Sequence, residues 1–366
     1  EEGELSRSWK EVCDYCIGCG MCAVECPSGV DIPRLIAEAR IRFADKNGLA
    51  PADLFLSEAD LGCALMSRFA PLANLASRNG MSRRLIELVA GVDRRRRLPE
   101  FNWPAKPVTR KKSSTAGDRP RVALFLDLFA RYNDPSLAGT VVTLLEELLD
   151  AEVVVPRLGS CGITAMLYGN RRTAFSLVEK NIDTLSSLVD RGYKVVSQEP
   201  TSVLSLRVEY PRWVDNPDAR KIAANTYELF EFLGMIEEQG GLLRPMPDNA
   251  IPERELVYHA PCHLKALGIG WPAQKFLSRI RGLRIVDSES ACCGMAGTFG
   301  MKTENYELSM RIGRALLEKM ESGSVSAGVS ECSTCRMQME SCGKMTFHPA
   351  ELVALAYGLV ELDVPE

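Results

Sequence analysis

The residues after position 119 contain one unit twice, and this duplication limits the chain to folds with two similar halves that face each other. In the later copy the segments HAPCH, ACCG and ECSTC contain cysteine, and LDLFA, GSCG and QEPTS stand at the matching places of the earlier copy. The matched positions are Leu128 with Cys262, Cys161 with Cys293, and Ser202 with Cys335, which are 134, 132 and 133 residues apart. The later copy keeps cysteines that the earlier copy has lost, apart from Cys161, which we predict to be a small buried apolar residue.

Short apolar runs alternate with longer amphipathic stretches throughout both copies. This alternation is typical of an α/β fold with mainly parallel strands. The predicted helices cover 137–150, 171–191 and 304–322, and the predicted strands cover 121–127, 152–156, 193–198, 255–259, 283–288 and 326–330.

A run of cysteines near the start of the chain has the spacing C-x2-C-x2-C-x3-C-P, which is associated with ferredoxins that bind 4Fe-4S clusters. Gly18 and Gly20 allow the tight loop that points several thiolates at one cluster. Zinc sites more often pair two separate C-x-x-C segments, so the run favours iron over zinc. The predicted ligands of this ferredoxin run are Cys16, Cys19, Cys22 and Cys26.

The sequence does not decide which residue is the fourth ligand of the cluster at the ferredoxin run. In two-cluster ferredoxins the cysteine before the proline binds the other cluster, and no partner run follows downstream. Either a second run precedes residue 1, which is Glu rather than Met, or Cys26 closes a single cluster, or Cys63 or Cys13 replaces it. We favour a role for Cys13 outside the cluster.

A second cysteine group follows the predicted strands of the later copy. The carboxyl ends of parallel strands gather ligands at one edge of a sheet, so a metal cluster is predicted here. Gly294 is expected to allow close backbone approach to cluster sulfur. The histidines His259, His263 and His348 are candidates for contacting the ligands or transferring protons. The predicted ligands are Cys262, Cys292, Cys293, Cys332 and Cys335.

The chain divides into four predicted parts. A small ferredoxin-like 4Fe-4S domain covers residues 1–50, where a helix follows Asp31. Residues 51–118 form a connector of one or two amphipathic helices, broken near Asn79-Gly80, and a basic linker rich in proline and serine. The degenerate first copy covers 119–250, and the cluster-binding second copy covers 251–366.

The charge of the chain gives no general attraction to nucleic acid or to anionic membranes, because the net charge is −4 and the pI about 5.7. A cytoplasmic setting is the expectation. Locally, the amphipathic residues 61–91 are followed by Arg94 to Arg97, Lys106 and Arg110 to Lys112, which could bring the protein to the inner face of the cell membrane. A packed connector with a solvated linker is the alternative.

The segments HAPCH, ACCGMAGTFG and ECSTCRMQM together resemble the cysteine-rich (CCG) domain of heterodisulfide reductase. Joined to a ferredoxin run, they are similar to the iron-sulfur subunit of anaerobic glycerol-3-phosphate dehydrogenase and to the C-terminal half of FAD-linked oxidases of D-lactate, glycolate or D-2-hydroxyglutarate. The resemblance implies that both cysteine sets are cluster ligands. The chain departs from the family in lacking an earlier ferredoxin run and in having Leu128, Ser160 and Ser202 where the glycerol-3-phosphate dehydrogenase type has cysteines, which implies one CCG cluster.

The sequence contains no P-loop and no G-x-G-x-x-G after a predicted strand, so substrate chemistry is expected outside this chain. We predict an iron-sulfur module of a flavin-dependent dehydrogenase that oxidises a 2-hydroxy acid or glycerol 3-phosphate. FAD lies on a partner domain or subunit, and electrons pass to a quinone or another acceptor. The alternatives are a catalytic subunit that reduces a disulfide or a quinone at the CCG cluster, and a zinc-stabilised interaction protein.

Overall fold

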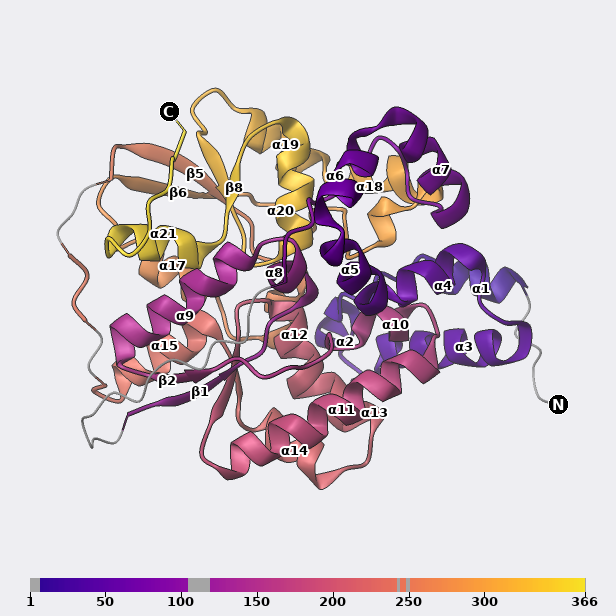
Figure 1. Ribbon diagram of the computed structural model, residues 1–366, viewed down its shortest axis with the longest axis horizontal. Helices are drawn as coiled ribbons and strands as arrows, with labels where there is room; N and C mark the ends of the chain where they lie inside the picture. Colours follow the sequence, from indigo (N-terminus) through magenta and orange to yellow (C-terminus); the bar gives the residue numbers. More distant parts are fainter. Residues whose placement is uncertain (1–6, 105–118, 242–243, 248–250, 366) are drawn as a thin grey trace.

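The computed structural model describes residues 7–104, 119–241, 244–247 and 251–365. It contains helices and two four-stranded sheets in which every paired strand is parallel, and Figure 1 shows a helical N-terminal part beside the two sheet-containing units. The predicted α/β fold with parallel strands is confirmed.

The first sheet has the order β2-β1-β3-β4. Val122 of the central strand pairs with Val153 on one side and Lys194 on the other. The strands are β1 (Arg121–Leu124), β2 (Glu152–Val154), β3 (Lys194–Ser197) and β4 (Thr226–Glu228). The helices of this unit are α8 (Leu128–Tyr132), α9 (Pro135–Leu149), α10 (Ile163–Leu167), α11 (Arg171–Asp190), α12 (Pro200–Leu204), the π-helix η1 (Ser205–Glu209), α13 (Tyr210–Trp213), α14 (Pro217–Ala223) and α15 (Leu229–Glu238).

The second sheet repeats this topology with the order β6-β5-β7-β8. Equivalent strands thus take equivalent places in both copies. The strands are β5 (Arg254–Tyr258), β6 (Leu283–Asp287), β7 (Ala327–Val329) and β8 (Thr346–Phe347). The helices are α16 (Cys262–Leu267), α17 (Pro272–Leu277), η2 (Phe299–Met301), η3 (Thr303–Asn305), α18 (Tyr306–Ile312), α19 (Arg314–Glu321), α20 (Ser333–Met339), η4 (Glu340–Cys342) and α21 (Pro349–Ala356).

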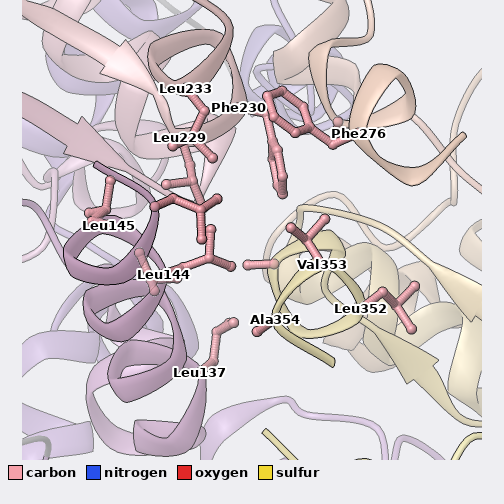
Figure 2. Close-up of a cluster of buried hydrophobic side chains, with 14 of the residues drawn as sticks. Leu137, Leu144, Leu145, Leu229, Phe230, Leu233, Phe276, Leu352, Val353 and Ala354 are labelled. Atoms are coloured by element: carbon pink, nitrogen blue, oxygen red, sulfur yellow. The ribbon is translucent and has the colours of Figure 1, made fainter. Parts of the chain in front are cut away.

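One large apolar core joins the two copies. Leu144 and Leu145 of α9, Phe230 of α15 and Val353 of α21 belong to this core, and Figure 2 shows Phe276 of α17 near Phe230. All five side chains are at most 2% exposed, and burying each contributes about 1.5–3 kcal/mol. This shared core fixes the two sheets relative to each other.

The N-terminal part contains more helices than predicted. Besides the break at Asn79, whose side chain accepts hydrogen bonds from Met81 N and Ser82 N, the chain breaks at Glu58 and Phe69. Phe69 lies two residues before Pro71, which takes one of the first two positions of the next helix. The helices are α1 (Arg7–Asp14), α2 (Met21–Glu25), α3 (Ile32–Asn47), α4 (Pro51–Ser57), α5 (Ala59–Arg68), α6 (Ala70–Arg78) and α7 (Gly80–Ala90).

The predicted helix over 304–322 is also divided, into α18 and α19, at Gly313. A Cβ atom at Gly313 would lie 2.4 Å from the carbonyl oxygen of Cys293. The division therefore occurs where a helix packs directly against the predicted ligand loop.

Candidate metal centre

The second cysteine group meets at the carboxyl end of the second sheet. His259 follows β5, and Cys262 begins α16. Cys332 caps α20, whose first turn carries Cys335, while Cys292 and Cys293 follow β6. Possible ligand atoms of His259, Cys293 and Cys335 all lie within 4.8 Å of one another.

The thiols of this group shift one another's pKa. Hydrogen bonds from Cys292 and then Cys335 hold the pKa of Cys293 well below its ordinary value, and the same contacts raise the pKa of Cys292 and Cys335. A hydrogen bond with Cys335 lowers the pKa of Cys332. Burial, followed by the charges of Cys332 and Cys293, raises the pKa of Cys262. Four of the five free thiols are linked by hydrogen bonds, from Cys292 through Cys293 and Cys335 to Cys332, and Cys262 interacts with them electrostatically. This arrangement fits a thiolate-rich metal cluster, because a bound cation stabilises thiolates that would otherwise repel one another.

His259 faces this group and contributes to the lowered pKa of Cys293. Its Nδ1 lies 3.0 Å from Ser288 Oγ, whereas its buried Nε2 has no nitrogen or oxygen partner within hydrogen-bond geometry among the described residues. A buried polar atom without a partner is costly, so the free nitrogen fits a hydrogen bond to a thiolate or to cluster sulfur. The position supports the predicted role of His259 beside the ligands.

The other two histidines have partners elsewhere. His263 Nδ1 lies 2.8 Å from Thr201 Oγ1, and its Nε2 donates to the carbonyl oxygen of Gly18 at 3.1 Å. His348 Nε2 donates to the carbonyl oxygen of Gln198, and its Nδ1 accepts from Ala350 N. His263 therefore connects three segments. Both ring nitrogens of His348 are engaged: Nε2 joins the two copies, and Nδ1 caps α21 within the second copy.

Position 294 has room only for glycine. Its φ is +86°, and a Cβ atom there would lie 2.1 Å from the carbonyl oxygen of Ser309. Its N–H donates to Cys292 Sγ at 3.3 Å. The backbone thus approaches both a predicted ligand and α18 as only glycine allows.

Arg96 supports the same loop and was missed in the sequence, where it stands in a basic run. The guanidinium is 5% exposed, and it donates to the carbonyl oxygen of Gly300 and to Gln338 Oε1 at 2.7 Å each. It also donates to Ser309 Oγ, which in turn donates to the carbonyl oxygen of Gly294. Residues 93–104 are therefore docked on the protein, whereas Lys106 and Arg110 to Lys112 of the basic segment lie outside the described residues.

The ferredoxin run forms the expected tight loop before α2. Gly18 and Gly20 have φ angles of +66° and +75°. Arg40 of α3 donates to the carbonyl oxygens of Cys13 and Cys16, which fixes the start of the loop. Burial, followed by the charges of Cys19 and Cys16, raises the pKa of Cys22, so these three thiols are neighbours.

The candidates for a replacement fourth ligand lie in different places. Cys13 is 1% exposed at the end of α1. Cys63 lies on α5, where burial raises the pKa of its thiol to about 12, with a smaller contribution from Asp60. Cys26 Sγ accepts a hydrogen bond from Val30 N at 3.4 Å. The choice among these cysteines stays a prediction.

The two cysteine sets lie next to each other. α2 packs against α16, and the charge of Cys19 contributes to the raised pKa of Cys262. Cys16 and the second cysteine group line one cavity of about 770 Å³, together with Leu128, Cys161 and Ser202 of the first copy. Cys161 packs in an apolar cluster of that copy.

The comparisons with known proteins fit this arrangement. A family model described as a cysteine-rich domain (CCG) matches residues 256–340. Lactate utilization protein A of Geobacillus kaustophilus is 33% identical over 195 residues, which cover 50% of this chain and 73% of that protein. The chain belongs to the CCG cysteine-rich domain family.

Two longer alignments extend the likeness beyond the CCG segment. A subunit of the anaerobic glycerol-3-phosphate dehydrogenase of Escherichia coli is 29% identical, with 90% of this chain and 83% of that protein aligned. The glycolate oxidase iron-sulfur subunit of Escherichia coli is 23% identical, with 97% and 84% aligned. The likeness to CCG proteins therefore includes the ferredoxin run and the first copy.

Proposed function

We propose that this chain is the iron-sulfur electron-transfer module of a flavin-dependent dehydrogenase. The ferredoxin run holds one 4Fe-4S cluster, and the second cysteine group holds another iron-sulfur cluster. When bound, each cluster supplies a one-electron carrier. The observation that carries the proposal is the contact between the two sets, through the hydrogen bond from His263 to Gly18 and the proximity of Cys19 to Cys262.

The surroundings of the second cysteine group favour electron flow toward it. Hydrogen bonds to sulfur raise the reduction potential of a cluster. Each set has a backbone N–H···S bond, from Gly294 N to Cys292 Sγ and from Val30 N to Cys26 Sγ. The second cysteine group has further contacts, because Thr334 Oγ1 lies 3.3 Å from Cys332 Sγ and His259 Nε2 can donate to a neighbouring sulfur. Electrons therefore enter at the ferredoxin run and leave from the second cysteine group.

The donor is a flavin on a partner domain or subunit, which oxidises a 2-hydroxy acid or glycerol 3-phosphate. The relatives whose names refer to glycerol 3-phosphate, glycolate and lactate support this substrate class. The final acceptor is a quinone or another electron acceptor.

The test is anaerobic purification followed by iron and sulfide analysis and electron paramagnetic resonance (EPR). We expect two distinguishable reducible clusters, of which Cys293→Ser removes one. Cys342→Ser is the matched control, because Cys342 Sγ donates to the carbonyl oxygen of Met339 and belongs to neither set. Zinc in place of iron, or an unchanged EPR spectrum in Cys293→Ser, would contradict the proposal.

Peripheral contact with a membrane is part of this proposal, and the surface of α5, α6 and α7 supports it. Leu88 is 83% exposed, and Leu72 and Leu75 are 66% and 67% exposed. None of the described helices is long and apolar enough to cross a bilayer. The exposed arginines Arg68 and Arg84 lie on the same helices and complement anionic lipid headgroups.

The basic run contributes less to this surface than its sequence suggests. Arg96 is buried, and Arg95 forms ion pairs with Asp93 and Glu307. We expect flotation with anionic liposomes to depend on Leu72 and Leu75, so that a double change to glutamine abolishes it. Met345→Gln, at another exposed apolar residue, is the control. Unchanged flotation of the double variant would exclude this surface as the contact.

A further inference from the structure

The cavity beside the second cysteine group extends well beyond the cysteines. The volume of about 770 Å³ belongs to the whole cavity, including the space beside the cysteines, and the part away from the cysteines is lined largely by apolar side chains. Leu56 and Val92, 7% and 4% exposed, belong to this wall. Five apolar lining residues pack as one cluster with Tyr168: Leu56, Ile86, Val92, Leu98 and Met301.

Four polar side chains in two pairs stand in the same wall. Lys302 Nζ lies 2.6 Å from Asp53 Oδ1, and the two side chains are only 14% and 9% exposed. The Tyr168 hydroxyl lies 2.7 Å from Thr298 Oγ1, and Lys302 Nζ lies 5.0 Å from the centre of the Tyr168 ring. A protonated amine and a phenol thus stand beside this apolar cluster.

The Lys302–Asp53 pair is connected to the protein surface by further ionisable groups. Lys10 Nζ lies 3.7 Å from Asp53 Oδ2 and also forms an ion pair with Asp14, whose side chain is 41% exposed. Glu304 Oε1, on a side chain 70% exposed, lies 3.5 Å from Lys302 Nζ. Protons can therefore reach Lys302 from solvent through carboxylates on two sides.

We propose that the apolar end of this cavity binds a lipid-soluble quinone and that Lys302, supplied with protons through Asp53, protonates it as it is reduced. This inference rests on the proposed function, because the electrons come from the reduced iron-sulfur clusters. A quinone ring is flat and apolar with two carbonyl acceptors, which matches apolar walls with a few donors. Tyr168 donates a hydrogen bond to one carbonyl oxygen while it accepts one from Thr298.

The reaction balances with two electrons and two protons. The two electrons would come from the bound clusters, one at a time, and the quinone gains them. An O–H bond forms at each carbonyl oxygen as the two C=O double bonds become C–O single bonds and the ring becomes aromatic, and no σ bond breaks. Lys302 gives a proton to one carbonyl oxygen and regains one through Asp53 from Lys10 and solvent, while the Tyr168 hydroxyl gives its proton to the other carbonyl oxygen and regains one from Lys302.

The exposed edge of the cavity, at α4 and α7, is apolar and suits the hydrocarbon tail of a lipid-soluble quinone. Phe55 of α4 and Leu85 of α7 line it and are 54% and 61% exposed. These residues continue into the exposed apolar surface of α7. A quinone bound between α4 and α7 would therefore leave its tail toward the surface that we propose for the membrane.

Binding is tested with menadione as the probe, by isothermal titration calorimetry on the cluster-loaded full chain. We expect Leu56→Trp to weaken menadione binding at least about 10-fold by filling the cavity, with unchanged iron content. Lys275→Met, an exposed lysine on α17, is the control and should bind like wild type. Absence of menadione binding to the wild-type chain, or equal binding by Leu56→Trp, would overturn the proposal.

Proton delivery is tested by comparing two acceptors in single-turnover oxidation of photoreduced protein. Ferricyanide takes an electron without a proton, whereas menadione needs both. We expect the ratio of the menadione rate to the ferricyanide rate to fall about 100-fold in Lys302→Met, the scale of a lost general acid. Tyr168→Phe, which removes one hydroxyl and keeps the Lys302–Asp53 pair, should lower the same ratio about 10-fold.

The outcomes separate the two proposals. If the wild-type chain loads clusters, and Lys302→Met and Tyr168→Phe both keep the wild-type ratio of the menadione rate to the ferricyanide rate, the quinone site alone is overturned. Lys302→Met with both rates lowered equally also overturns it, because the defect is then general. A wild-type chain that loads no iron-sulfur cluster overturns the proposed function itself.

Discussion

His263 Nε2 lies 3.1 Å from the carbonyl oxygen of Gly18, although the two residues are 245 positions apart. His263 directly follows Cys262, and Gly18 lies between Cys16 and Cys19. The other ring nitrogen of His263 contacts Thr201 in the first copy. One imidazole therefore holds the ferredoxin run, the second cysteine group and the degenerate copy in register.

Replacing His263 by leucine is expected to loosen the ferredoxin run from α16. Both clusters should still assemble, because His263 supplies no thiolate, but their magnetic coupling in the reduced EPR spectrum should weaken. Thr201→Val is the control, since it removes the other partner and leaves the bond to Gly18. If the magnetic coupling is as strong in His263→Leu as in wild type, the hydrogen bond from His263 to Gly18 does not set the distance between the two clusters.

Gly294→Ala is expected to destroy the second cluster and spare the first. The added Cβ would lie 2.1 Å from the carbonyl oxygen of Ser309, so the loop carrying Cys292 and Cys293 must move. Gly297→Ala is a matched control in the same loop, with φ of +62° but no atom within 4 Å of the new Cβ. Iron analysis and EPR should show loss of one cluster only in Gly294→Ala, and equal iron contents in the two variants would contradict the steric argument.

The strand positions that carry the second cysteine group were predictable from the sequence. Each of the strands β1, β2, β3, β5, β6 and β7 lies within a predicted range or within one residue of it, because each falls in a short apolar run. The strands β4 (Thr-Tyr-Glu) and β8 (Thr-Phe) were missed, because neither contains a continuous apolar run.

The inward direction of Arg96 could not be predicted in this way. Nothing local separates Arg96 from Arg94, Arg95 and Arg97, and what buries it is a set of acceptors more than 200 residues away. The separate helices of the connector were likewise underestimated, because breaks at Glu58 and Phe69 interrupt one amphipathic pattern. Tertiary contacts decide such features more than sequence periodicity does.

Arg96→Gln is expected to lower the free energy of unfolding by about 3 kcal/mol, because buried acceptors lose a charged donor. Iron should also leave the second cysteine group faster under a chelator, since Arg96 supports Ser309 and Gly294. Arg94→Gln is the control: Arg94 is exposed, with an ion pair to Glu87 at 3.8 Å, so its change should stay within about 0.5 kcal/mol. Equal effects of the two substitutions in anaerobic urea unfolding would refute the assigned role.

His348 is expected to make the protein sensitive to acid. Burial lowers the pKa of His348 from 6.5 to about 3 in the folded protein. Between these values the unfolded chain binds a proton that the folded chain does not, so stability falls as the pH drops below about 6.5, by up to about 1.4 kcal/mol per pH unit. Above that range the residue is neutral in both states and has no such effect.

His348→Gln should flatten this dependence, because glutamine cannot titrate and can still donate to the carbonyl oxygen of Gln198. His348→Asn is a second variant that keeps a side-chain cap on α21. The measurement is the thermal unfolding midpoint of wild type and both variants, recorded anaerobically from pH 8 to pH 5. The wild-type midpoint should fall more steeply with acid than that of either variant. Parallel curves for all three proteins would mean that His348 titrates normally in the folded state.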